Sequence, residues 1–217
     1  MAELRTEEEQ VEAIKNWWQE NGKSLVVTLA VVVSAVFGWR AWQSNQDASA
    51  ATASALYESL SASVEAVQQL DDVQVTSMTH LGKQLKDDFG SSAYAPMAAM
   101  VLARVYVEQG DLVAAQNELE YVISSEKARP TLIELAKLRK IQILLGQSEL
   151  DAAATLLASI DDTTYSSLFY ELSGDLAYAQ GDAAKARDAY RLAMESSDPQ
   201  TRSLIQLKYD DLASGDS

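Results

Sequence analysis

Cysteine is absent from this 217-residue sequence, and histidine and proline are scarce, with one and three residues. A chain without cysteine has no disulfide, no thiolate nucleophile, no iron–sulfur cluster, no cysteine-based zinc site and no lipid-modified N-terminal cysteine. The absence does not identify the compartment, because about 170 residues suffice to stabilise a domain by packing alone.

The single histidine, His80, gives no support to catalysis. A triad needs a base beside a nucleophile, and a histidine-based metal site usually needs two imidazoles. No phosphate-binding G-x-x-x-x-G-K-[ST] loop is present, and no G-x-G-x-x-G follows a strand. Paired aspartates fall at predicted helix ends, where caps and solvated turns explain them. We therefore expect no enzyme activity, no cofactor, no metal and no small-molecule substrate.

Basic residues are few: 17 Lys and Arg stand against 32 Asp and Glu, for a net charge of −15. The first 42 residues hold four basic and six acidic side chains, which leaves 13 basic and 26 acidic for the remainder. A domain this acidic repels phosphate backbones, so nucleic acid is not an expected partner.

A 16-residue run without charge, residues 24–39, reads SLVVTLAVVVSAVFGW. At about 1.5 Å per residue it covers roughly 24 Å, slightly less than a ~30 Å hydrocarbon core. All four tryptophans border it, as in an aromatic belt, and flanking basic residues can snorkel to the headgroups. A buried core helix would not explain both tryptophan pairs, so we predict a transmembrane signal anchor over 23–42. Its interface anchors are Trp17, Trp18, Lys23, Trp39, Arg40 and Trp42.

The basic residues near the span predict its orientation. Arg5, Lys15 and Lys23 lie upstream, whereas only Arg40 follows before residue 83. This bias predicts a cytoplasmic N-terminus and an exported C-terminal domain. Cleavage after the small residues 48–50 is the alternative, but the preceding segment is long and glutamate-rich, which favours an uncleaved anchor.

Two features of the N-terminal part are compatible with further contacts. Val11, Ile14 and Trp18 give one face of a short helix an apolar character, and with Gly22 as a break this helix could lie along the membrane interface. A polar extension of the membrane helix is the other interpretation, and the sequence does not separate the two. Within the span a stripe of small residues, which allows close approach of another membrane helix, comprises Ala30, Ser34 and Gly38.

The region after the span is expected to be a helical repeat. Strand signals are nearly absent, and apolar residues recur at helical spacing. Gly110, Gly146 and Gly181 are separated by 36 and 35 residues, close to the 34-residue period of tetratricopeptide repeats. Each lies between two helical stretches, where a tight turn requires φ > 0.

The third unit carries the clearest repeat pattern. Gly174 is followed by Ala186, Tyr190 and Ala193, at the spacing used for small–large–small packing between the two helices, and Pro199 closes the unit. The first unit keeps several equivalent residues, and the middle unit keeps fewer and has a turn about two residues longer.

We thus predict an all-α fold, with an N-terminal transmembrane helix followed by a tetratricopeptide-like α-solenoid of helix pairs. The expected segments are a cytoplasmic amphipathic segment (1–22), the transmembrane signal anchor (23–42), a membrane-proximal helix pair (43–90, with helices at 47–70 and 74–89), the repeats (91–200), and a capping helix with a tail (201–217).

Groove-facing positions on the first helix of each repeat are the candidate protein-binding residues. Methionines beside an aromatic residue suit varied apolar segments, and two basic residues in the set could hold a carboxylate. The alternative is that the apolar members of the set lie in the core. The set is Met97, Met100, Arg104, Val107, Lys140, Ile143, Leu144, Glu171, Asp175 and Tyr178.

The N-terminal stretches QVEAIK (10–15), ENGK (20–23) and GWR (38–40), with Trp42, resemble the ancillary subunit of the bacterial SecYEG translocon, the YfgM family. The resemblance extends through the repeats. It implies an inner-membrane protein with a periplasmic repeat domain that associates with the translocon and a membrane-anchored periplasmic chaperone, and helps hand exported polypeptides onward. It brings no catalytic residues.

Two other functions are compatible with the residues. One is a scaffold or assembly factor for another inner-membrane or envelope complex, and the other is a domain that only self-associates. Co-purification in mild detergent distinguishes the first from a translocon subunit.

Overall fold

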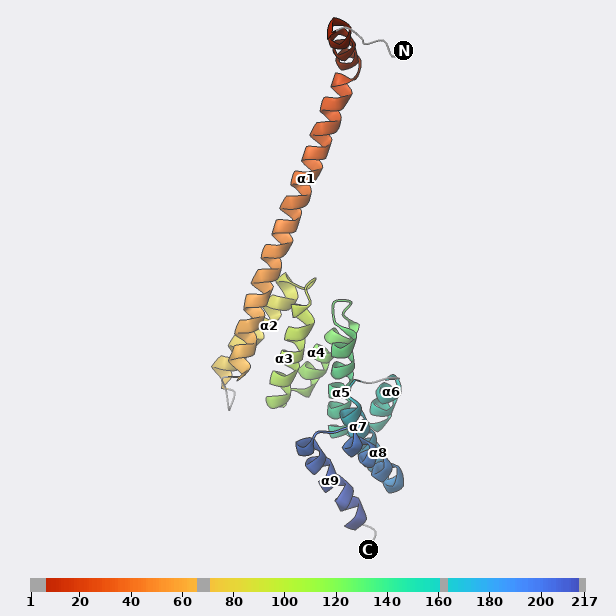
Figure 1. The fold of residues 1–217 in the computed structure, drawn as a ribbon. Coiled ribbons are helices and arrows are strands. Elements are labelled where there is room, and N and C mark those ends of the chain that lie inside the picture. Colours follow the sequence, from red (N-terminus) through yellow and green to blue (C-terminus); the bar gives the residue numbers. More distant parts are fainter. Residues whose placement is uncertain (1–6, 66–70, 161–163, 215–217) are drawn as a thin grey trace, which may run out of the picture. The chain divides into compact units, whose positions relative to one another are not determined.

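A computed structural model describes residues 7–65, 71–160 and 164–214, and these residues are all-helical apart from turns (Figure 1). The fold class predicted from sequence is confirmed. The chain divides into two compact units, Met1–Thr52 and Ala53–Ser217. The helices are α1 (Glu7–Glu65), α2 (Asp72–Asp88), α3 (Tyr94–Glu108), α4 (Leu112–Ser124), α5 (Pro130–Gly146), α6 (Leu150–Ala158), α7 (Ser166–Ala179), α8 (Ala183–Glu195) and α9 (Pro199–Ser214).

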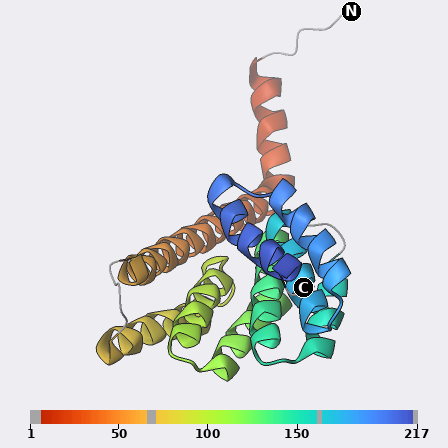
Figure 2. The ribbon, with the colours of Figure 1, turned by 90° about the horizontal axis from the view of Figure 1, so that it is seen from below.

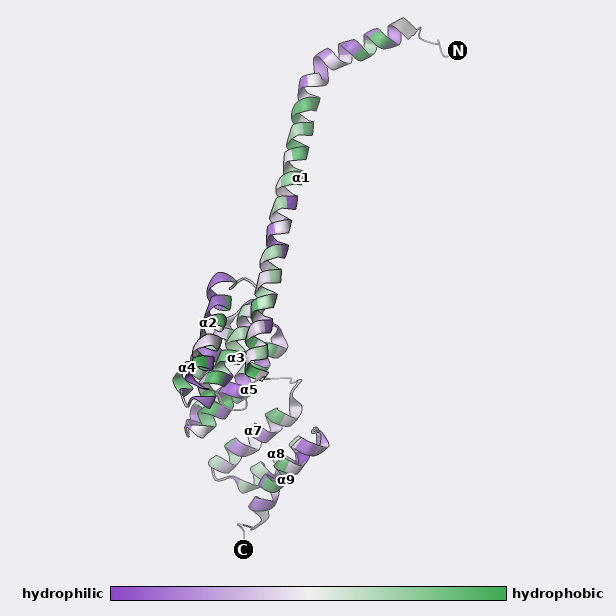
Figure 3. Ribbon diagram, turned by 90° about the vertical axis from the view of Figure 1, so that its left-hand side faces the viewer, coloured by the Kyte–Doolittle hydropathy of each residue, from purple (hydrophilic) through white to green (hydrophobic). Residues whose placement is uncertain are grey.

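Helix α1 runs unbroken for 59 residues, so Gly22 does not break the helix, as one of the two interpretations of the sequence had it. The predicted helices at 47–70 and 74–89 correspond to the end of α1 and to α2, and residues 66–70 lie outside the described part. Figure 3 shows the apolar stretch of α1 as a green band. Among the described residues α1 is the helix long and apolar enough to cross a membrane, and none of its apolar window is buried.

The second unit is built from helix pairs that pack in sequence order, as Figure 2 shows from yellow to blue. Four clusters of buried side chains hold it together. The first joins the end of α1 to α2 and α3, the next joins α3, α4 and α5, then come α5, α6 and α7, and the last joins α7, α8 and α9. Helices α3, α5 and α7 therefore belong to two clusters each, which couples neighbouring repeats as in a solenoid.

The turns within the three repeats share one geometry. Gly110 and Gly181 have φ of +78° and +83°, whereas in the middle repeat Ser148 takes this conformation, with φ of +61°. The prediction of a positive φ at Gly146 is therefore wrong, because α5 continues through this residue and the turn begins later.

Candidate interaction surfaces

Counting back from the positive-φ residue of each turn shows which helix positions are equivalent. Val107 and Tyr178 lie three residues before Gly110 and Gly181. Three residues before Ser148 is Leu145. The same count pairs Arg104 and Asp175 with Gln142, and Met100 and Glu171 with Leu138. In the middle repeat the equivalent positions are therefore Leu138, Gln142 and Leu145. They follow from alignment on Ser148, which lies two residues after Gly146, the residue on which the sequence-based alignment rested.

The first repeat has an accessible edge at the end of α3. Met97 and Met100 are half-buried, whereas Val107 is 44% exposed. Arg104 is exposed and its Nε donates a 2.7 Å hydrogen bond to Glu108 Oε1. This guanidinium is paired within its own helix at the surface, where such a pair contributes little to stability.

In the middle repeat the sequence-predicted residues lie in the core or in an ion pair. Ile143 is 7% exposed and packs with α3 and α4, and Leu144 is 4% exposed and packs with α6 and α7. Lys140 Nζ lies 2.7 Å from Glu120 Oε2 on α4. Of the positions equivalent by turn geometry, Gln142 is exposed and Leu145 is half-buried.

The third repeat combines an acidic pair with α9. Lys208 of α9 donates hydrogen bonds to Glu171 (2.7 Å) and Asp175 (2.8 Å) of α7. The Tyr190 hydroxyl of α8 also donates to Asp175, at 2.8 Å. Tyr178, one turn further along α7, is 57% exposed. The last helix thus covers the acidic part of this repeat and leaves the tyrosine accessible.

Burial and charge shift the pKa values in this cluster. Burial, followed by the hydrogen bond to Asp175, raises the pKa of Tyr190 far above its usual range. Burial alone would lower the pKa of Lys208, but hydrogen bonds to Asp175 and Glu171 and their charges raise it overall. Both groups keep their protons at neutral pH. The hydrogen bonds that they donate to Glu171 and Asp175 therefore hold α8 and α9 against α7.

A further ion pair, between α2 and α4, was not predicted from sequence. Lys86 Nζ lies 2.6 and 2.7 Å from the two carboxylate oxygens of Glu118, and the side chains are only 17% and 10% exposed. Lys86 also lies 5.2 Å from the ring centroid of Tyr121. Burial, then the charges of Glu118 and Asp87, raise the pKa of Tyr121. The partners are 32 residues apart, and no local pattern indicates such a pair.

The span presents its side chains outward throughout. The interface tryptophans are 51% (Trp17), 54% (Trp18), 63% (Trp39) and 55% (Trp42) exposed, and the last two rings lie 5.2 Å apart. The flanking Lys23 and Arg40 are exposed as well. This is the arrangement that an aromatic belt requires.

The small-residue stripe of the span is open to a neighbour. The side chains of Ala30 and Ser34 are exposed, and a Cβ added at Gly38 would have no atom within 4 Å. A second membrane helix could therefore approach the backbone closely along this stripe.

The described part of the chain shows no cluster of side chains typical of a metal site. His80 is exposed, and no group of three or more His, Cys, Asp or Glu among the described residues could hold a metal ion. An open pocket of about 470 Å³ lies beside the start of α5. Its Lys137 is bonded to the carbonyl and hydroxyl oxygens of Ser159, at 3.3 and 3.2 Å.

Comparison with known proteins agrees with this architecture. Residues 15–214 match the family described as tetratricopeptide repeat-like domain. Proteins named ancillary SecYEG translocon subunit are similar along almost the whole chain. The protein from Haemophilus influenzae is 29% identical and that from Aggregatibacter actinomycetemcomitans 30%, each over 98% of this chain and 100% of the relative. The Escherichia coli K12 protein is 29% identical over 95% of this chain and 97% of the relative. No solved structure matches the chain.

Proposed function

Because this chain belongs to the family of ancillary SecYEG translocon subunits, with their tetratricopeptide-like fold, we propose that it is a non-enzymatic, membrane-anchored adaptor of the translocon. It binds SecYEG, links it to a membrane-anchored periplasmic chaperone and passes exported polypeptides on. The observation that carries the proposal is the likeness over the full length of the relatives, which includes both anchor and repeats. The exposed span and the repeat surface supply two separate contact regions.

We further propose that the protein resides in the bacterial inner membrane as a single-pass protein. The excess of Arg5, Lys15 and Lys23 over Arg40 supports a cytoplasmic N-terminus and a periplasmic repeat domain. By function we divide the chain into the cytoplasmic segment 1–22, the anchor 23–42, the membrane-proximal helices 43–90, the repeats 91–200 and the cap 201–217.

The span is the proposed contact with the membrane-embedded translocon. Ala30, Ser34 and Gly38 form its closest-approach surface, because small side chains let two helix backbones meet. Confinement to the membrane also raises the local concentration of the repeat domain near the translocon exit, so weak contacts with a polypeptide suffice.

The repeat surface is the proposed contact with chaperone or polypeptide. The proposed contact row consists of one residue per repeat at the end of each first helix: the exposed Val107 and Tyr178 and the half-buried Leu145. The half-buried Met97 and Met100 adjoin this row on α3, and flexible thioethers adapt to varied apolar segments. Polar positions nearby would set orientation rather than affinity.

Site-specific photocrosslinking in intact cells tests the proposal. Probes replace Ser34 in the span and Val107 and Tyr178 on the repeats. Matched controls are Val36, on the opposite side of α1, and Val113, an exposed residue at the start of α4.

Translocon subunits should be captured from Ser34 more than from Val36, and chaperone or exported polypeptides from the repeat row more than from Val113. Capture of another envelope complex, with none of the translocon, would refute the proposal. The chain would then be a scaffold or assembly factor for that complex.

A further inference from the structure

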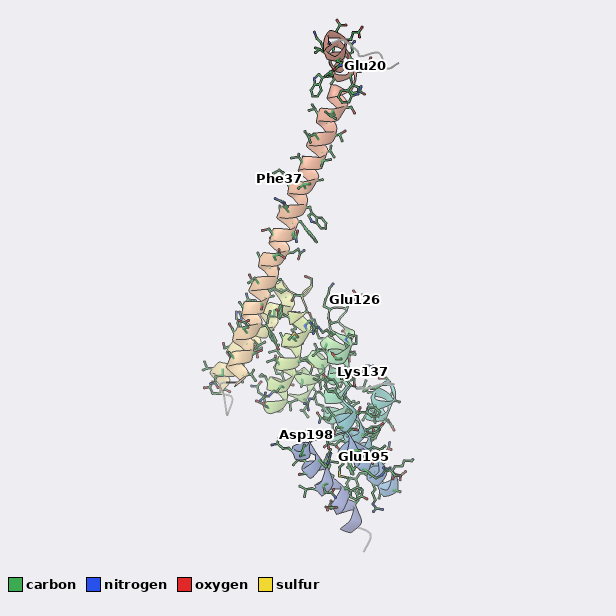
Figure 4. All side chains as sticks on the ribbon, in the orientation of Figure 1. Glu20, Phe37, Glu126, Lys137, Glu195 and Asp198 are labelled. Atoms are coloured by element: carbon green, nitrogen blue, oxygen red, sulfur yellow. The ribbon has the colours of Figure 1, made fainter. Side chains whose placement is uncertain are left out.

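Helix α1 changes direction close to Glu20, before the apolar run begins. Figure 4 labels Glu20 at this corner and Phe37 on the straight part beyond it, and Figure 3 shows the N-terminal leg pointing away from the apolar leg. The backbone stays helical throughout. The two legs therefore have different axes. When the apolar leg crosses a bilayer, the N-terminal leg is inclined towards the membrane plane.

The N-terminal leg has one mainly apolar face. Val11 and Ile14 are 63% and 68% exposed, and Trp17 and Trp18 are 51% and 54% exposed. With 3.6 residues per turn these four side chains fall within an arc of about 120°. Among residues 9–21 the charged side chains fall outside this arc: Glu9, Glu12, Lys15 and Glu20.

Trp18 connects this face to the membrane span. A Cβ added at Gly22 would lie 3.1–3.3 Å from atoms of the Trp18 indole, so the ring rests on the glycine backbone at the corner. Gly22 is buried beneath it. Leu25, one turn beyond Gly22, lies on the same side of the helix, and the apolar face thereby extends past the polar Asn21 into the span.

We propose that residues 9–21 lie along the membrane surface as an interfacial helix, with Val11, Ile14, Trp17 and Trp18 inserted among the lipids. The occupant of this face is the lipid surface, because the face is continuous with the membrane-crossing part of the same helix. Three glutamates against one lysine on the leg make electrostatic attraction to anionic lipids a minor contribution, so burial of apolar area supplies the binding. Amphipathic helices with aromatic anchors bind interfaces in this way.

The cysteine-free chain allows single labelling sites for the test. Full-length variants Val11→Cys, Ile14→Cys, Glu12→Cys and Asn16→Cys carry a nitroxide in vesicles of phosphatidylethanolamine and phosphatidylglycerol. Phe37→Cys reports the span. Collision with oxygen marks a lipid environment, and collision with a water-soluble nickel complex marks an aqueous one.

Labels at Val11, Ile14 and Phe37 should favour oxygen, and labels at Glu12 and Asn16 should favour nickel. Equal access to nickel at all four N-terminal sites would overturn the inference, as would oxygen preference at all four, which marks a straight extension of the span. The inference rests on membrane anchorage but not on the translocon as partner. A Phe37 label in water would contradict the anchorage itself, whereas loss of translocon capture leaves the label pattern unchanged.

Discussion

Gly174 of α7 and Tyr190 of α8 are in tight contact: a Cβ added at Gly174 would lie 2.4 Å from Cε1 of the Tyr190 ring. The ring is 3% exposed and packs directly on the helix backbone. Gly82 and Leu102 repeat this arrangement between α2 and α3, where the corresponding distance is 2.6 Å. Because glycine has no side chain, the large side chain of the facing residue, Tyr190 or Leu102, fills the space between the two helices at each site.

Gly174→Ala should therefore destabilise the repeat domain by about 2 kcal/mol. The added methyl cannot fit unless the ring moves, and overpacking of this kind typically costs 1–3 kcal/mol. Urea unfolding of the full chain in detergent, followed by circular dichroism, measures the change. Gly146→Ala is the matched control, because this helical glycine has no atom within 4 Å of an added Cβ, and a stability equal to or slightly above that of the parent chain is expected. Equal destabilisation by both changes would contradict the packing account.

Ser148→Gly should stabilise the chain by roughly 0.5–1 kcal/mol. The serine holds φ at +61°, where an L side chain costs about 1–2 kcal/mol, and the greater freedom of glycine in the unfolded chain offsets part of the gain. The converse change Gly110→Ser should destabilise by a similar amount, because this glycine has φ of +78°. Thermal unfolding of the two variants in parallel measures both effects. A loss of stability in Ser148→Gly would contradict this account, because it would show that contacts of the serine side chain stabilise the fold by more than its backbone conformation costs.

Removal of one partner of the Lys86–Glu118 pair should cost about 2 kcal/mol. The pair is bidentate and mostly buried, so either single change, Lys86→Met or Glu118→Gln, leaves a charged or polar group without its partner. The double change Lys86→Met with Glu118→Gln should cost less than the sum of the two single changes. Denaturant unfolding in a double-mutant cycle checks this coupling, and strict additivity would contradict it.

Stability should decline above about pH 10, with Tyr190 and Lys208 as contributors. Both pKa values are raised on folding. Above the usual tyrosine pKa of 10.0, the folded chain therefore keeps protons that the unfolded chain loses. The free energy of unfolding consequently falls as the pH rises through this range. Tyr190→Phe should lose about 1–2 kcal/mol at neutral pH with the hydrogen bond to Asp175, yet decline less steeply in alkali. Unfolding curves from pH 7 to about pH 11 test this, and parallel curves for both proteins would exclude Tyr190 as a contributor.

The repeat architecture could be read from sequence where local pattern determines it. The spacing of Gly174, Ala186, Tyr190 and Ala193 predicted a helix pair, and the last three are buried where α7 and α8 pack. Periodicity of this kind reports packing directly, because a helix buries the same face in every turn.

Two glycines differ in the structure from what their sequence context suggested, for physical reasons. Gly22 does not break α1, since a glycine costs a helix only about 1 kcal/mol and the Trp18 ring covers it. Gly146 does not form the turn, although its spacing fits the repeat. The better signal was the triplet Gln147-Ser148-Glu149, which parallels Gln-Gly-Asp at 109–111 and 180–182.

The contacts of the candidate site depended on tertiary structure. Lys208 reaches Glu171 across 37 residues, and nothing in either local segment identifies the other as a partner. The sequence could place polar residues on a helix face, but only the packed helices show which of them are already paired and which, like Tyr178, stay accessible.

Association with the translocon through the span is the central claim, and co-purification in mild detergent tests it most directly. The full-length chain is compared with a variant carrying leucine at Ala30, Ser34 and Gly38, and with a control carrying leucine at Val32 and Val36 on the opposite side of the helix. SecYEG subunits should co-purify with the parent chain and the control and be reduced at least severalfold with the stripe variant, because bulky side chains hold the helices apart. Absence of SecYEG subunits from the parent preparation, with another envelope complex in their place, would contradict the account.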